Sequence, residues 1–150
     1  MIDTASLQKY SLFGGILPED IERLQPMLVQ ASFPEGEAIM REGERNDKIY
    51  FILEGRVEVS KKKKALIELK EGDTFGEMEL LDVMPAAATV SALCPVRVAA
   101  ISNRAVHEIY KMDTKIFSLM IMNLARDLSR RLRRMDEVVV AEPEAGDRAK

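Results

Sequence analysis

The residues best suited to bind a ligand lie in one short segment, Phe75 to Val90, which reads FGEMELLDVMPAAATV. This run predicts a strand that ends at Gly76, followed by one turn of helix whose first backbone N–H groups lack intrahelical partners. Free N–H groups of this kind bind anions, and a glycine allows the backbone to approach a ligand closely. Glu77 adds a carboxylate that accepts hydrogen bonds from sugar hydroxyls. The segment therefore predicts a pocket for a ligand with an anionic group and hydroxyls.

The other reactive side chains do not form a recognisable catalytic or metal site. The chain has one histidine, His107, and one cysteine, Cys94. A single cysteine excludes an intrachain disulfide, and one histidine is too few for a zinc site of Cys and His ligands within one chain. The motifs GxSxG, GxxxxGK[ST] and HExxH are absent. We expect a surface or structural His107, a packed and inert Cys94, no metal, and no enzymatic activity.

The composition is typical of one soluble domain. The chain has 150 residues, of which 47% are hydrophobic and 31% are charged, enough to bury an ordinary core. Its 22 basic and 25 acidic side chains give a net charge of -3, which provides no chain-wide attraction to nucleic acid or to an anionic membrane. The sequence shows neither a secretory signal nor an apolar run of membrane-spanning length. We therefore expect a cytoplasmic protein that does not bind membranes.

Two changes of pattern predict the elements that position this segment. From Thr4 to Gln30, leucines and isoleucines recur at helical spacing, interrupted by Gly14, Gly15 and Pro18, which predicts two short helices. From Ala31 to Ser102, short β-rich runs alternate with glycine and proline turns. Short strands at such close spacing favour an antiparallel jelly-roll β-barrel. The expected fold is mainly β, with N-terminal helices and a long C-terminal helix.

The C-terminal part predicts two helices, the second of them long. Ser102 is a good cap for the helix NRAVHEIYKM, and Asp113 caps a helix that runs to about Val139. Apolar side chains recur along it at steps of three or four: Phe117, Ile121, Leu124, Leu128, Leu132, Met135 and Val139. The helix is longer than one small barrel covers, so its later half predicts a homodimer contact. Residues 1–139 are expected to form one domain and residues 140–150 a disordered tail.

A cluster of arginines on this helix has two interpretations. The arginines are Arg126, Arg130, Arg131, Arg133 and Arg134, and Asp127 is the acid among them. They form either a nucleic-acid surface or a solvated face beside a dimer seam. The acidic neighbours Asp136 and Glu137 favour the solvated face. Nucleic acid is therefore not an expected partner.

The segment Phe75 to Val90 resembles the phosphate-binding cassette of cyclic-nucleotide-binding domains, which occur in catabolite-activator-type regulators, kinase regulatory subunits and cyclic-nucleotide-gated channels. Upstream, LFGGILPEDIERLQPML, FPEGEAIMREGERNDKIYFILEGRVEV and LKEGDTFGEMELL keep the family's order of helix, glycine turns and strands. Downstream, VRVAAISNRAVHEI and the long helix match its closing elements. The resemblance implies an eight-stranded jelly roll in a non-catalytic signalling module. It also implies a C-terminal helix that senses ligand and often dimerises.

The resemblance also assigns ligand contacts to individual positions. Glu77 corresponds to the glutamate that binds the ribose 2′-hydroxyl, and nearby backbone groups correspond to those that face the phosphate. Asn123 lies where the family contacts the base, although a polar residue in a helical seam equally fixes the register between two chains. The predicted site comprises Gly76, Glu77, Met78, Glu79, Ala86, Ala87 and Asn123.

The cassette departs from the family pattern at two positions. The arginine that pairs with the cyclic phosphate follows the cassette proline, and here Pro85 is followed by Ala86. Glu79 adds a carboxylate where the family has a small residue. Each charge-assisted hydrogen bond contributes roughly 1.5–3 kcal/mol, so losing an arginine fork weakens binding on the order of a hundredfold or more. The sequence therefore predicts weak or lost binding of cyclic AMP or cyclic GMP.

Two alternatives remain at this point. One is a genuine cyclic-nucleotide sensor in which a cation from elsewhere, such as Arg41 or Arg97, replaces the missing arginine. The other is a dimerisation or scaffolding module that docks a protein partner and holds no small ligand.

Overall fold

The barrel consists of two four-stranded antiparallel sheets in the computed structural model, which describes residues 2–141 apart from the side chains of Leu80, Val138, Val139 and Ala141. One sheet has the strand order β1-β8-β3-β6 and the other β2-β7-β4-β5. The strands are β1 (Val29–Phe33), β2 (Ala38–Met40), β3 (Lys48–Glu54), β4 (Arg56–Lys61), β5 (Lys64–Lys70), β6 (Thr74–Phe75), β7 (Thr89–Ala92) and β8 (Val96–Ser102). The predicted mainly β fold, an antiparallel barrel of eight strands, is confirmed.

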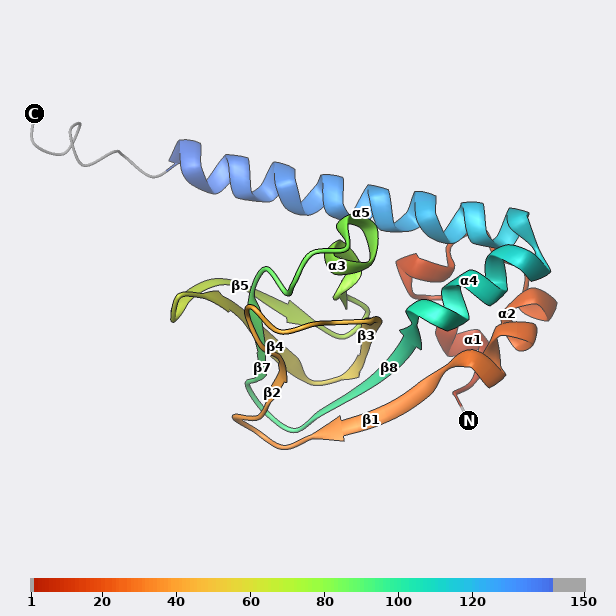
Figure 1. Cartoon of the computed structure of the whole chain (residues 1–150), viewed down its shortest axis with the longest axis horizontal. Coiled ribbons are helices and arrows are strands. Elements are labelled where there is room, and N and C mark those ends of the chain that lie inside the picture. The colour runs from red at the N-terminus through yellow and green to blue at the C-terminus, as the bar shows by residue number, and fades with distance from the viewer. Residues whose placement is uncertain (1, 142–150) are drawn as a thin grey trace, which may run out of the picture.

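Helices flank the barrel at one end and along one side (Figure 1). They are α1 (Thr4–Leu7), η1 (Ser11–Phe13), α2 (Pro18–Leu24), η2 (Gln25–Met27), α3 (Glu77–Asp82), α4 (Asn103–Met112) and α5 (Thr114–Ala141). The predicted caps are confirmed: the Ser102 hydroxyl accepts from the Ala105 N–H at 3.0 Å, and the Asp113 carboxylate accepts from the Lys115 N–H at 3.0 Å. Helix α5 continues to Ala141, and the predicted disordered tail falls, from residue 142 onward, outside the described residues.

Strands β3 and β8 separate two hydrophobic cores. Successive side chains of a strand point to opposite faces, so Val98 lies in the core between the sheets while Ala99 lies in the core beneath the helices. The helical core joins α1, η1, α2 and α4 to the first half of α5 through Ile116, Met120 and Leu124. That half of α5 is therefore anchored on the domain.

The second half of α5 leaves this core. In Figure 1 it passes α3 and continues above the strands of the barrel, apart from them in this view. Leu128 is half-buried, whereas Leu132 is 62% exposed and Met135 is 46% exposed. The predicted apolar stripe is thus partly to fully buried as far as Leu124 and open to solvent near its end. The side chain of its last member, Val139, lies outside the described residues.

Asn123 joins α5 to the N-terminal helices. Its side chain is buried and its Nδ2 donates to the carbonyl oxygens of Leu12, at 3.0 Å, and Gly14, at 2.9 Å. These bonds satisfy carbonyls at the end of η1, which would otherwise be buried without partners. In this structure the amide nitrogen thus binds within its own chain. The two predicted roles of Asn123, contact with a ligand base and register between two chains, stay predictions.

We predict that Asn123→Ala lowers the free energy of unfolding by about 1–3 kcal/mol, because both carbonyls lose a buried donor. Urea denaturation of the variant against the unmutated chain measures the change. Ser129→Ala, at an exposed position of the same helix, is the matched control and should stay within about 0.5 kcal/mol. Equal stability of Asn123→Ala and the control would show that these bonds do not hold α5 in place.

Candidate functional site

Gly76 makes the sharp turn that starts the cassette. Its φ is +87°, and a Cβ at this position would lie 2.5 Å from the carbonyl oxygen of Lys48 on β3. Only glycine adopts this conformation this close to another strand. Its own carbonyl accepts a hydrogen bond from Asn46 Nδ2 at 3.1 Å. The turn therefore places the first residue of α3 against the barrel.

Glu77, the first residue of α3, is buried and paired with a cation from the other end of the chain. Its Oε1 accepts a hydrogen bond from Arg131 of α5 at 2.9 Å. The same guanidinium donates to the carbonyl oxygen of Thr74 on β6. The two paired side chains are 17% exposed for Arg131 and 4% exposed for Glu77. Figure 1 shows α3 lying between the barrel and the middle of α5, where this contact forms.

The charges of the site are poorly solvated. Burial raises the pKa of Glu77, and the attraction of Arg131 opposes that rise without cancelling it. Burial also raises the pKa of Glu79, and the neighbouring Glu77 raises it further. Two buried polar atoms, the Glu77 Oε2 acceptor and the Thr74 hydroxyl, have no hydrogen-bond partner among the described residues. The cassette thus contains two neighbouring buried carboxyl groups with raised pKa values, and two polar atoms that lack a hydrogen-bond partner in the described part of the chain.

The structure brings part of the predicted site together. Glu77 and Glu79 are both buried on the first turn of α3, directly after Gly76, whereas Met78 between them is 47% exposed. Ala86 is buried, and its backbone is occupied: its N–H donates to the Glu44 carbonyl at 2.8 Å and its carbonyl accepts from the Gly43 N–H at 2.9 Å.

Ala87, next to Ala86, is half-buried. The main-chain groups of Ala86 are bound within the fold and are not free for an anion.

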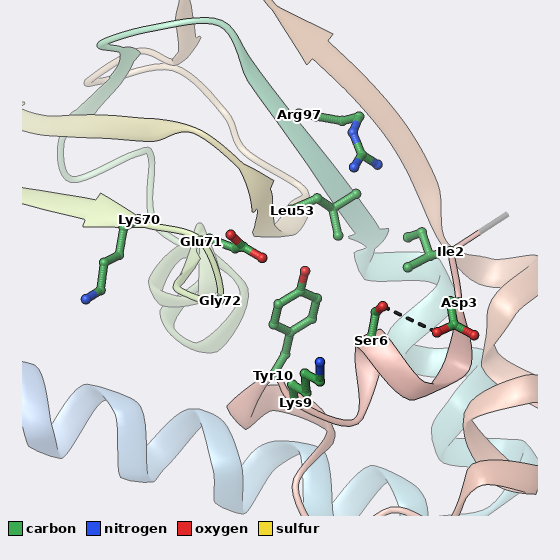
Figure 2. Close-up of a pocket in the computed structure, with 10 residues that line it drawn as sticks. All are labelled: Ile2, Asp3, Ser6, Lys9, Tyr10, Leu53, Lys70, Glu71, Gly72 and Arg97. Atoms are coloured by element: carbon green, nitrogen blue, oxygen red, sulfur yellow. Dashed lines mark hydrogen bonds between the residues drawn. The ribbon is translucent and has the colours of Figure 1, made fainter.

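Neither cation considered as a replacement for the missing arginine contacts the cassette carboxylates. Arg97 of β8 lines a different cavity, of about 670 Å³, between α1 and the barrel. Tyr10 and Glu71 line the same cavity (Figure 2), and the Nε of Arg97 lies 3.5 Å from Glu54 Oε2. Arg41 is exposed and forms no ion pair within the described part of the chain.

The cation that does reach the cassette, Arg131, was not singled out by the sequence. The sequence alone groups Arg131 with the solvated arginines, of which Arg126, Arg130, Arg133 and Arg134 are exposed in the structure. Arg131 instead lies seven residues after the buried Leu124, on the same helical face. The seven-residue spacing indicates that Arg131 faces the domain. It identifies Glu77 as the partner of Arg131 only once α3 is known to lie beside α5.

Two further classes of site find no support in the described residues. Between residues 2 and 141, His, Cys, Asp and Glu side chains form no group of three that would hold a metal ion. Over the same range, none of the helices has the length and apolar character needed to cross a membrane.

Comparison with known proteins places this geometry in context. A family model described as "Cyclic nucleotide-binding domain" matches residues 30–113. A CRP-like cAMP-activated global transcriptional regulator of Mycobacterium tuberculosis is 28% identical over 133 residues, covering 85% of this chain and 58% of the regulator. A cAMP-dependent protein kinase regulatory subunit of Debaryomyces hansenii is 34% identical over 96 residues, covering 63% of this chain and 21% of the subunit. The chain thus spans between about a fifth and three fifths of these relatives.

A solved structure shows the same fold over almost the whole chain. A cyclic nucleotide-binding domain from Methylobacillus flagellatus superposes with a TM-score of 0.83 at 24% identity, covering 95% of this chain and 84% of that one. The family model ends at residue 113, before α5 begins. Arg131 therefore lies outside the matched region, whereas its partner Glu77 lies inside it.

We predict that Arg131→Met lowers the free energy of unfolding at pH 7 by about 2–4 kcal/mol, because it leaves the Glu77 carboxylate buried without its cation. Adding Glu77→Gln should restore part of this loss, since the uncompensated charge is then gone. Urea denaturation of the two single variants and the double variant gives the coupling. Arg133→Met, at an exposed position two residues away, is the control. Additive effects of the two substitutions would contradict the pairing.

The pKa directions also predict a pH dependence of stability. The folded-state pKa of Glu77 is raised, so the folded state holds its proton to higher pH than the unfolded state, in which glutamates have a pKa of about 4.3. The free energy of unfolding should therefore fall as the pH rises from that value through the folded pKa. Arg131→Met should extend the fall to higher pH, and Glu77→Gln should remove the Glu77 part of it. Identical pH profiles in all three proteins would contradict the assignment.

Proposed function

The chain belongs to the cyclic nucleotide-binding domain family, and from this membership we propose that it is a non-catalytic regulatory module in which ligand binding at the cassette sets the position of α5. The observation that carries the proposal is the Arg131–Glu77 pair, because it joins the predicted ligand-binding carboxylate directly to the C-terminal helix. A ligand hydroxyl that binds Glu77 changes the strength of this contact. Ligand occupancy of the cassette is thereby coupled to the position of α5.

The second half of α5 is the part of the chain whose position the cassette controls. After the half-buried Leu128, Arg131 is the next side chain of the helix that lies against the domain, and the described side chains beyond it are exposed. A charge-assisted hydrogen bond contributes roughly 1.5–3 kcal/mol, which corresponds to a shift of about 10- to 150-fold between two positions of the helix. A change at Glu77 alone is therefore large enough to operate a two-state switch.

We further propose that cyclic AMP and cyclic GMP bind weakly or not at all. The cassette has Ala86 in place of a cation, and the buried Glu79 adds negative charge. One observation favours the alternative of a genuine sensor: Arg131 is a cation within the cassette. To neutralise a phosphate, however, Arg131 has to leave Glu77, and the loss of that contact offsets the gain.

Calorimetric titration of the full chain with cyclic AMP at moderate salt tests this part. We expect no submicromolar binding by the unmutated chain, and a gain on the order of a hundredfold in the double variant Glu79→Ala, Ala86→Arg, because the charge-assisted fork is restored. Adding Glu77→Gln to that variant should reduce the gain, since the ribose contact is weakened. Submicromolar affinity without any substitution would contradict the proposal and favour the sensor.

The exposed end of the apolar stripe supports a homodimer. Leu132 and Met135 are large, apolar and exposed, and arginines flank them. A two-fold contact would bury the same strip on both chains while the arginines stay hydrated at its edges. We propose that the partner of α5 is a second α5, with another regulatory protein as the alternative occupant.

We predict that Leu132→Glu with Met135→Glu converts the dimer to a monomer while the barrel stays folded. Sedimentation reports the mass and circular dichroism reports the fold. The control is Arg126→Ala with Arg133→Ala, which changes the charge by the same amount on another face of the helix and should leave the dimer intact. A monomer at high micromolar concentration before any substitution would contradict the dimer.

A further inference from the structure

The first relevant property of the cassette is its excess of negative charge. Glu77 and Glu79 are both buried on the first turn of α3, and one cation, Arg131, pairs with Glu77. Asp82 of α3 and Asp127 of α5 act on these carboxylates with the same sign of charge, and Asp127 is itself paired with Arg130 at 3.1 Å. With Ala86 neutral, the groups around the cassette carry more negative than positive charge. An anionic ligand therefore meets repulsion where it approaches Glu77.

The second property is the type of hydrogen bond that the cassette lacks. Glu77 Oε2 is a buried acceptor without a donor, and Thr74 Oγ1 is a buried hydroxyl without a partner. An ionised carboxylate only accepts hydrogen bonds, so the missing group is a donor. Hydroxyls of a sugar donate, whereas an ionised phosphodiester does not. The unfilled hydrogen-bonding capacity and the charge thus point to the same ligand chemistry.

We propose that the cassette selects an uncharged ligand with adjacent hydroxyl groups, a nucleoside in preference to its 3′,5′-cyclic monophosphate. This inference rests on the proposed function, in which the cassette binds a small ligand. A nucleoside offers both the 2′- and the 3′-hydroxyl, while the cyclic phosphate consumes the 3′-oxygen and adds a negative charge. Losing one hydrogen bond and gaining the repulsion weakens the cyclic compound at least about tenfold.

The Arg131 contact is compatible with such a ligand. A carboxylate accepts at both oxygens, and Arg131 occupies Oε1 while Oε2 has no partner. A hydroxyl that donates to Oε2 therefore satisfies a buried acceptor, and a second hydroxyl that competes for Oε1 weakens the hold on α5. One neutral diol thus both fills the site and acts on the helix.

Calorimetry of the full chain at pH 7 with matched pairs tests the inference: adenosine, guanosine, cytidine and uridine, each against its 3′,5′-cyclic monophosphate. For the base that binds, we expect the nucleoside to bind at least tenfold more tightly than the cyclic compound. The corresponding 2′-deoxynucleoside should lose about tenfold, as should the nucleoside with Glu77→Gln.

The variant Glu79→Gln distinguishes electrostatic repulsion of the ligand by Glu79 from steric exclusion by its side chain. It keeps the size of the side chain and removes one negative charge, so it should improve binding of the cyclic monophosphate several-fold while nucleoside binding stays within about threefold. Equal effects of Glu79→Gln on both compounds would overturn the electrostatic argument.

Two results distinguish failure of this inference from failure of the proposed function. Tighter binding of a cyclic monophosphate than of its nucleoside would overturn the inference and leave a ligand-binding cassette in place. No binding of any of the eight compounds at millimolar concentration, to the unmutated chain or to Arg131→Ala, would overturn both, because the site is then closed even without the guanidinium.

Discussion

The contact between Arg131 and Glu77 joins two parts of this protein that the chain builds independently. Gly76 allows β6 to turn against β3, which fixes Glu77 at the start of α3. Asn123 fixes the first half of α5 on the N-terminal helices. Each anchor determines the position of one partner, and the 2.9 Å pair then holds the cassette and the second half of α5 together. Without this pair, the exposed end of α5 has little contact with the domain.

The pair is also electrostatically incomplete, which makes it suitable for a switch. Taking a carboxylate out of water costs several kcal/mol, and a single guanidinium recovers only part of that cost. The raised pKa of Glu77 is the consequence, and the crowding by Glu79 is reflected in the raised pKa of its own carboxyl group. Because the Glu77 carboxylate is only partly compensated, a proton, a hydrogen-bond donor or a new charge next to it changes its free energy. The site therefore responds to each of these changes.

Much of the fold could be predicted from the sequence because it depends on local rules. Strand alternation, the caps Ser102 and Asp113, and the strand–glycine–helix pattern of the cassette all express short-range preferences. Other features depend on contacts between residues far apart in the chain: the hydrogen bonds of Asn123, those of Ala86 with the 43–44 turn, and the burial of Arg131. Arg131 has four exposed arginines around it in the sequence, and only the placement of α3 beside α5 distinguishes it from them.

Hydrogen exchange in α5 tests the central claim most directly. If Glu77 holds the second half of the helix against the domain, Glu77→Gln should speed exchange of the backbone amides of residues 128–135, because a helix end without tertiary contact is only marginally stable. The amides of β3 and β8 should exchange as before, since both strands lie in the main cores. Unchanged protection of residues 128–135 in the Glu77→Gln variant would contradict the account.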